Sequence, residues 1–184
     1  MQKTIYYLPG RGGRLTSGLG MALKERGYSV FGREISGAFQ KLSFTDQVNV
    51  VASDLLTDFC NDDSLLVANS FGAYFFLHAQ AQTLPFKGKV LLLSPIVGES
   101  SREETLANFI PPRADELQKV FMSGNYPAPR RCEIHVGSED WQSGPANVLK
   151  IASSIGANFY IVSGVGHELG KEYVARVLDS WLES

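Results

Sequence analysis

The chain of 184 residues contains only two cysteines, no long apolar run and no excess of basic side chains. Cys60 and Cys132 are distant in sequence and neither belongs to a CxxC pair, so reduced structural thiols are expected. Neither cysteine lies at a predicted strand-to-helix turn, which disfavours a catalytic thiol. The longest apolar run, around Lys89–Val97, is far too short to cross a bilayer.

The formal net charge is −2, from 17 basic and 19 acidic residues. The basic residues are spread along the chain and form no stripe with aromatic residues, so no nucleic-acid partner is expected. The N-terminus enters a strand-like run directly, without a cleavable apolar segment, which predicts a cytoplasmic protein with no membrane partner. The length suits one well-buried core, so residues 1–184 are expected to form a single domain.

Short apolar runs alternate with helix-like stretches along the whole chain. The predicted strands are Thr4–Leu8, Tyr28–Ile35, Ser64–Asn69, Lys89–Leu93, Cys132–Val136 and Asn158–Val162. The predicted helices between and after them are Leu15–Arg26, Thr45–Cys60, Phe71–Gln82, Pro145–Ile155 and Tyr173–Leu182. This alternation predicts an α/β protein, a three-layer α/β/α sandwich around a mostly parallel six-stranded sheet.

One connection, Pro95–Arg131, is long for a compact domain and holds a short predicted helix, Ala114–Met122. We interpret its central part, at about 98–129, as a small lid-like excursion above the sheet. Its apolar residues could line an acyl pocket or simply seat the short helix on the sheet: Phe109, Ile110, Phe121 and Met122. Because the excursion is short, an open site that favours small or short acyl groups is expected.

Reactive side chains follow three of the predicted strands, at the edge where a doubly wound sheet binds its ligands. Ser70 follows the third strand, Asp140 the fifth and His167 the sixth. A serine, an acid and a histidine are therefore expected at one edge of the sheet, in the chain order Ser, Asp, His. Glu139, next to Asp140, is an alternative acid. The other histidines, His78 and His135, fall inside a helix and a strand and are expected to be structural.

The surroundings of Ser70 suit a nucleophile. Ala68 and Gly72 are small, so a tight strand-turn-helix can hold the hydroxyl clear of the sheet. The amide of Phe71, at the start of a helix, can stabilise an oxyanion. His167 can take the serine proton, and a carboxylate can orient the imidazole. Ser70 could instead be a helix N-cap.

Four segments spread over the chain carry a resemblance to the α/β-hydrolase superfamily: LPGRGG, ANSFG, HVGSED and GVGHE. The chain is similar to compact bacterial serine esterases and to the retinoblastoma-binding-protein type of serine hydrolase. The resemblance implies a minimal fold with strand order 2-1-3-4-5-6, and it adds the amide of Arg11 as second oxyanion donor. It implies a serine hydrolase that forms an acyl-enzyme from a small ester or thioester, without metal or cofactor. Ala68 and Pro9 stand where the family usually has glycine and often has histidine.

Three further residues are candidates for the substrate pocket: Asn69, Trp141 and Phe109. Trp141 and Phe109 could equally serve packing. Oligomeric state is not indicated by the sequence.

Two other functions remain open. Gly10–Gly12 after a strand, with Glu34 ending the next one, imitates a dinucleotide-binding unit, but Leu15 stands where its third glycine belongs. The fold could also serve as a non-catalytic protein-binding module.

Overall fold

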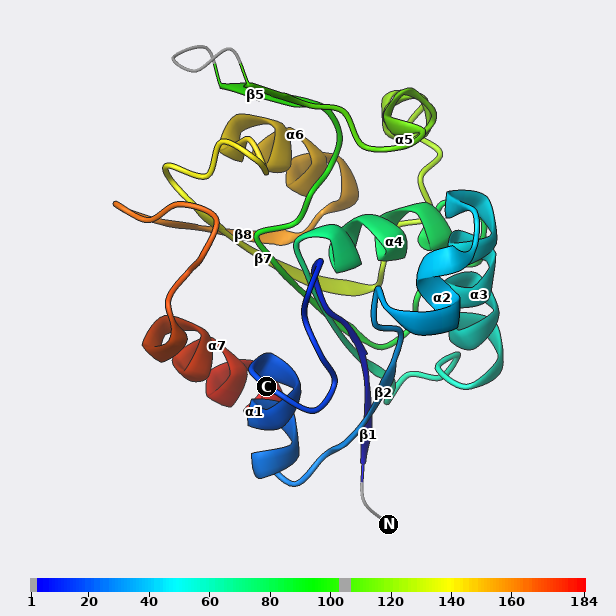
Figure 1. The fold of residues 1–184 in the computed structure, drawn as a ribbon, viewed down its shortest axis with the longest axis vertical. Coiled ribbons are helices and arrows are strands. Elements are labelled where there is room, and N and C mark those ends of the chain that lie inside the picture. Colours follow the sequence, from blue (N-terminus) through cyan, green and yellow to red (C-terminus); the bar gives the residue numbers. More distant parts are fainter. Residues whose placement is uncertain (1–2, 103–106) are drawn as a thin grey trace.

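The computed structural model describes residues 3–102 and 107–184. A six-stranded sheet forms its centre, in the order β2-β1-β3-β4-β7-β8, with all neighbours parallel (Figure 1). The strands are β1 (Thr4–Leu8), β2 (Ser29–Gly32), β3 (Leu65–Asn69), β4 (Lys89–Leu93), β7 (Arg131–Gly137) and β8 (Asn158–Val162). The predicted fold class and strand order are confirmed, and the numbering differs because two short strands intervene along the chain.

Helices cover both faces of the sheet. The helices are α1 (Leu19–Glu25), α2 (Gly37–Lys41), α3 (Phe44–Thr57), α4 (Phe71–Gln80), α5 (Ala114–Met122), α6 (Pro145–Ile155) and α7 (Lys171–Glu183). Helices α1 and α7 lie on one face, and α3, α4 and α6 lie on the other (Figure 1). Within the described ranges, no helix is both long and apolar enough to span a membrane.

The two faces of the central strands divide the core into two clusters. In β1, Tyr6 and Leu8 face α3 and α4, whereas Ile5 and Tyr7 face α1 and α7. All four side chains are at most 3% exposed. Strands buried on both faces read as continuous apolar runs, which is why the sequence predicted them well.

The apolar spacing predicted that helix α1 begins at Leu15, but it begins at Leu19. Gly18 has a φ of 52°, which ends any helix that would start earlier. A Cβ on Gly20 would lie 2.5 Å from the carbonyl oxygen of Leu15, so the turn packs tightly against the helix. Helix α1 is therefore four residues shorter at its N-terminus than predicted.

Strand β2 is also shorter than the predicted Tyr28–Ile35, because β1 pairs with it only from Thr4 to Tyr7. After Leu8, the chain continues with Pro9, which has no amide proton to extend the ladder. Helix α2 and one antiparallel hairpin, β5 (Ser100–Arg102) with β6 (Ala107–Phe109), were not predicted. Their elements are five residues or fewer, too short to show a periodic pattern.

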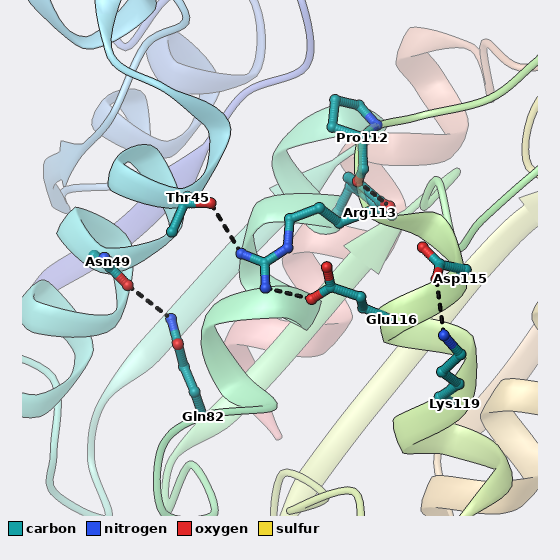
Figure 2. A network of polar contacts seen from close by, with 9 residues as sticks. Thr45, Asn49, Gln82, Pro112, Arg113, Asp115, Glu116 and Lys119 are labelled. Carbon is teal, nitrogen blue, oxygen red and sulfur yellow. Dashed lines mark hydrogen bonds and ion pairs between the residues drawn. The ribbon is translucent and has the colours of Figure 1, made fainter.

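The segment predicted as an excursion contains β5, β6 and α5, and residues 103–106 within it lie outside the described structure. Helix α5 has the predicted bounds. Arg113 ties it to α3, because its Nη1 donates a hydrogen bond to Thr45 Oγ1 (2.9 Å) while Nη2 pairs with Glu116 (Figure 2). The hydroxyl of Tyr74 in α4 donates to the carbonyl of Pro112 (2.8 Å). The excursion is therefore anchored to the helices beneath it.

His78 lies in α4 among aromatic rings near this anchor. Its ring contacts those of Phe44 and Tyr74, with centroids 5.0 and 4.6 Å away. Its Nε2 has no hydrogen-bond partner among the described residues. Burial, reinforced by the positive charge of Arg113, lowers the pKa of His78 to about 4. The folded protein therefore holds this imidazole neutral.

We expect His78 to make the protein less stable as the pH falls from about 6.5 towards about 4. In that window His78 binds a proton in the unfolded chain but stays neutral in the folded chain. The free energy of unfolding therefore decreases with acidification. His78→Phe should lose less stability than the wild type between about pH 7 and about pH 5 in urea denaturation. An identical loss in both proteins would contradict this assignment.

Candidate active site

Ser70 forms a strained turn between β3 and α4. Its φ of 52° and ψ of −122° lie in a region that residues other than glycine rarely adopt. The side chain makes no capping hydrogen bond to α4. Instead, Ser70 Oγ lies 2.8 Å from Nε2 of His167. Ser70 therefore occupies the N-cap position of α4, but its hydroxyl does not cap the helix and points to the histidine.

Small residues on either side of Ser70 have different tasks. A Cβ on Gly72 would lie 2.0 Å from the carbonyl oxygen of Leu8, so only glycine lets α4 approach the end of β1 this closely. Ala68 lies within the sheet, fully buried and paired with Leu8 and Leu92. Its methyl group packs in the core, so the alanine is accommodated without disturbing the turn.

The loops that carry Asp140 and His167 follow β7 and β8 and approach each other closely. A Cβ on Gly137 would lie 2.2 Å from the carbonyl oxygen of Gly166, so this approach requires glycine. Two backbone hydrogen bonds also join these segments, Ser138 N to Val162 O (2.8 Å) and Glu139 N to Val165 O (3.0 Å). In addition, the amide of Gly164 donates to the Ser138 hydroxyl (2.9 Å). The neighbouring strands thus hold acid and histidine in one fixed arrangement.

Asp140 is fully buried and contacts the histidine on the side away from Ser70. His167 Nδ1 lies 2.9 and 3.0 Å from the two carboxylate oxygens, and the amides of Gln142 and Ser143 donate to Oδ1 (3.1 and 3.0 Å). Burial raises the pKa of Asp140, but the hydrogen bonds from His167 and Ser143 outweigh it and leave the pKa lowered. Glu139, the alternative acid, is exposed and makes no such contact in the described structure.

Ser143 was not recognised from the sequence. It is 2% exposed, and its Oγ lies 3.5 Å from His167 Nδ1. Its hydroxyl also hydrogen-bonds to Asp140 and helps to lower the pKa of that carboxyl. The available signal was the spacing Asp-x-x-Ser after a strand, since an aspartate often accepts hydrogen bonds from amides two and three residues later.

Ser94 is a second residue that the sequence did not reveal. It follows β4, whose Leu93 pairs with Asn69, so it lies beside Ser70 at the edge of the sheet. It also has a positive φ, of 43°, and its buried hydroxyl has no hydrogen-bond partner among the described residues. The signal was an apolar strand ending in serine, LLLS, which resembles the end of β3.

The glycine loop after β1 is held against the serine turn. Asn69 Oδ1 accepts hydrogen bonds from the Tyr7 hydroxyl (2.9 Å) and the Gly10 amide (3.3 Å). The guanidinium of Arg11 lies over the ring of Phe71, 4.4 Å from its centroid. Within the described chain, the backbone amides of Arg11 and Phe71 donate to no protein acceptor. Both residues line the same cavity as Ser70.

A cavity of about 1010 Å³ opens at these residues. Its lining includes Ser70, His167, Arg11, Phe71, Asn69 and Phe109. Trp141 does not line it, whereas its neighbour Gln142 does. A smaller cavity of about 410 Å³ lies between α5 and α6, and Phe121 and Met122 line that one instead. Of the apolar residues of the excursion that the sequence singled out, only Phe109 lines the cavity at Ser70.

No family model and no curated protein sequence matches the chain. Solved structures do match over nearly its whole length. Mouse alpha/beta hydrolase domain-containing protein 10 aligns with a TM-score of 0.70 at 14% identity, over 98% of this chain and 89% of that one. The Paleococcus ferrophilus monoacylglycerol lipase aligns with a TM-score of 0.70 at 13% identity, over 97% of this chain and 93% of that one. The ydeN gene product of B. subtilis aligns with a TM-score of 0.67 at 18% identity, over 100% of both chains. The protein has the α/β-hydrolase fold.

The dinucleotide interpretation of the glycine loop does not suit this α/β-hydrolase fold. Glu34 does not line the cavity; its Oε1 accepts a hydrogen bond from the amide of Leu15 (2.6 Å) and its Oε2 one from Arg14 Nη1 (3.1 Å). The hydrogen bond from Leu15 holds the pKa of Glu34 below its usual range. Helix α1 begins six residues after Gly13, so its N-terminus does not directly follow the glycines. The acid stabilises the turn and is not presented to a ribose.

The other candidate groups serve packing. His135 is 4% exposed, and its ring nitrogens lie 2.7 Å from Glu133 Oε1 and 2.7 Å from the Tyr173 hydroxyl. Burial raises the pKa of Cys132 to about 12, so this thiol stays protonated. Cys60 is exposed, outside the residues that line the cavity.

Gly72→Ala should destabilise the fold by about 2 kcal/mol, because its Cβ would collide with the Leu8 carbonyl. Gly166→Ala is the matched control, since the nearest atom to its added Cβ lies 3.9 Å away. Its free energy of unfolding should change by no more than about 0.5 kcal/mol. Denaturant titration measures both, and equal stabilities would contradict the crowding at Gly72.

Proposed function

We propose that the chain is a single-domain serine hydrolase that cleaves a small ester or thioester through an acyl-enzyme. The observation that carries this proposal is the hydrogen-bonded series from Ser70 through His167 to the buried Asp140, at the floor of the large cavity. The strained turn supports it further, because a positive φ at serine costs about 1–3 kcal/mol and such strain clusters at functional sites.

In the acylation step, Ser70 Oγ attacks the carbonyl carbon of the substrate while His167 Nε2 takes the hydroxyl proton. Asp140 remains ionised, keeps the proton of His167 on Nδ1 and stabilises the imidazolium. The amides of Arg11 and Phe71 donate hydrogen bonds to the oxyanion. His167 then gives its proton to the departing alcohol or thiol, which leaves the acyl group on Ser70.

In the deacylation step, a water molecule replaces the leaving group. His167 takes a proton from this water, whose oxygen attacks the acyl carbon and forms a second oxyanion. The bond to Ser70 Oγ then breaks, the serine recovers its proton from His167, and a carboxylic acid is released. The proposed steps use only water and groups of this chain.

Structures with similar folds include the monoacylglycerol lipase above and carboxylesterases of a thaumarchaeon, Nitrososphaera gargenis. The latter align at a TM-score of 0.64 and 14% identity, over 99% of this chain and 90% of that one. Their names support an ester as the substrate class. A thioester has the same acyl carbon and reacts by the same steps.

A fluorophosphonate should label the folded wild type on Ser70, because the activated hydroxyl attacks the phosphorus as it would a carbonyl. Ser70→Ala should take up no label, and His167→Ala should react much more slowly. Mapping the modified peptide by mass spectrometry identifies the site. Labelling that persists in Ser70→Ala would contradict Ser70 as the nucleophile. A folded wild type that does not react would favour the non-catalytic binding module.

Asp140→Asn should lower kcat/KM for p-nitrophenyl acetate by about 10³–10⁴-fold, since an amide holds the imidazole in the wrong tautomer. Glu139→Gln removes the adjacent exposed carboxylate and is the matched control. Its kcat/KM should stay within about twofold of the wild type. A similar loss in both variants would show that Asp140 has no special role.

A further inference from the structure

The cavity at Ser70 extends between two helices, and we call this part of it the arm. Beyond Ser70 and His167, its lining continues along α1 and α7. These two helices lie beside each other on one face of the sheet (Figure 1). From Leu19 to Arg26 the arm follows about 10 Å of α1, at 1.5 Å per residue. A short acyl group at Ser70 would leave this space unfilled.

Small residues line the arm along both helices. Gly18, directly before α1, has no side chain and lines the cavity. Ala22 of α1 and Ala175 of α7 both line it. Their small side chains leave room between the helices.

Apolar side chains form the inner wall of the arm. Leu169 and Leu178 are buried, and Val174 and Leu19 pack against the same cluster. The charged residues that line the arm are two acids, Glu25 and Glu168, and two bases, Arg26 and Lys171, so the arm has no excess of either sign. This combination suits an uncharged, linear chain.

Arg26 also lines the arm, and its guanidinium is not free to bind an anion. Its Nε donates to Asp179 Oδ1 (2.7 Å), Nη1 to the carbonyl of Ala22 (2.9 Å) and Nη2 to the carbonyl of Ala175 (3.3 Å). The bonds to Asp179 and Ala175 join the end of α1 to α7. A ligand in the arm therefore meets a guanidinium that is already paired with a carboxylate.

We propose that the arm between α1 and α7 binds a linear aliphatic chain of the ester that Ser70 attacks. The inference rests on the proposed function, and it replaces the short acyl groups predicted from the sequence with esters of longer chains. The aliphatic chain can belong to the acyl part or to the alcohol part of the ester, because the arm starts beside Ser70 and both parts meet at the bond that Ser70 breaks.

Two ester series test the proposal: p-nitrophenyl acetate against octanoate, and methyl acetate against octyl acetate. Each buried methylene contributes up to about fourfold in binding, so wild-type kcat/KM should rise at least about tenfold along one series. Which series rises identifies the part of the substrate that enters the arm. A wild type that shows no gain in either series overturns the proposal.

Ala22→Trp and Ala175→Trp fill the arm from opposite helices. In both, the ratio of kcat/KM between the long and the short ester should fall to about one. Ala146→Trp is the matched control: Ala146 is exposed on α6 and does not line the cavity, so its ratio should equal that of the wild type. Using a ratio within each protein cancels general losses of activity. If both arm variants retain the wild-type gain, the proposal is wrong.

Binding without turnover separates this inference from the proposed function. Decanoate below its micellar concentration should raise the Tm of the wild type and of Ala146→Trp, but not of Ala22→Trp or Ala175→Trp. If this pattern holds and no ester is cleaved, the arm binds aliphatic chains and the hydrolase proposal fails. Suppose instead that Ser70 is acylated, but that the ratio of kcat/KM between long and short esters and the Tm shift with decanoate are the same in Ala22→Trp, Ala175→Trp and the wild type. The hydrolase proposal then stands and the arm inference fails.

Discussion

The close approach of α4 to the end of β1 is the constraint on which the rest of the site depends. With no side chain at Gly72, the helix can start directly beside Leu8, and the chain must then turn at Ser70 with a φ of 52°. That turn lifts the hydroxyl off the helix axis and towards His167, 2.8 Å away. It also places the first amide of α4 next to the glycine loop, where Arg11 packs on Phe71.

The opposite half of the site depends on a balance of burial and hydrogen bonding. A fully buried carboxylate is costly by itself, and burial alone would neutralise Asp140. The contacts from His167 and Ser143 reverse that effect and keep the pKa low. These donors come from the loop of Asp140 itself and from the neighbouring loop after β8. The lowered pKa of the buried carboxyl therefore depends on the contact between the two loops.

Several features could be predicted because they follow from local pattern. The four central strands of the main sheet, β1, β3, β4 and β7, are largely buried apolar runs, and the residues after parallel strands must meet at one edge. This is why Ser70, Asp140 and His167 could be expected together. The predictions failed where backbone conformation overrode side-chain spacing, as at Gly18, where a positive φ delays α1 to Leu19. They also missed β5, β6 and α2, which are too short for a period to appear.

By itself, the sequence determined a parallel α/β sheet with Ser70, Asp140 and His167 at one edge, since both depend on hydrophobic pattern and chain order. The α/β-hydrolase fold and its strand order were implied by the resemblance to that superfamily. Only the tertiary structure decided which neighbours those side chains have. It placed Ser143 against His167, left Trp141 outside the cavity and opened the arm between α1 and α7. Such contacts join residues from separate elements, and their geometry depends on how helices and loops pack, which no single stretch of sequence contains.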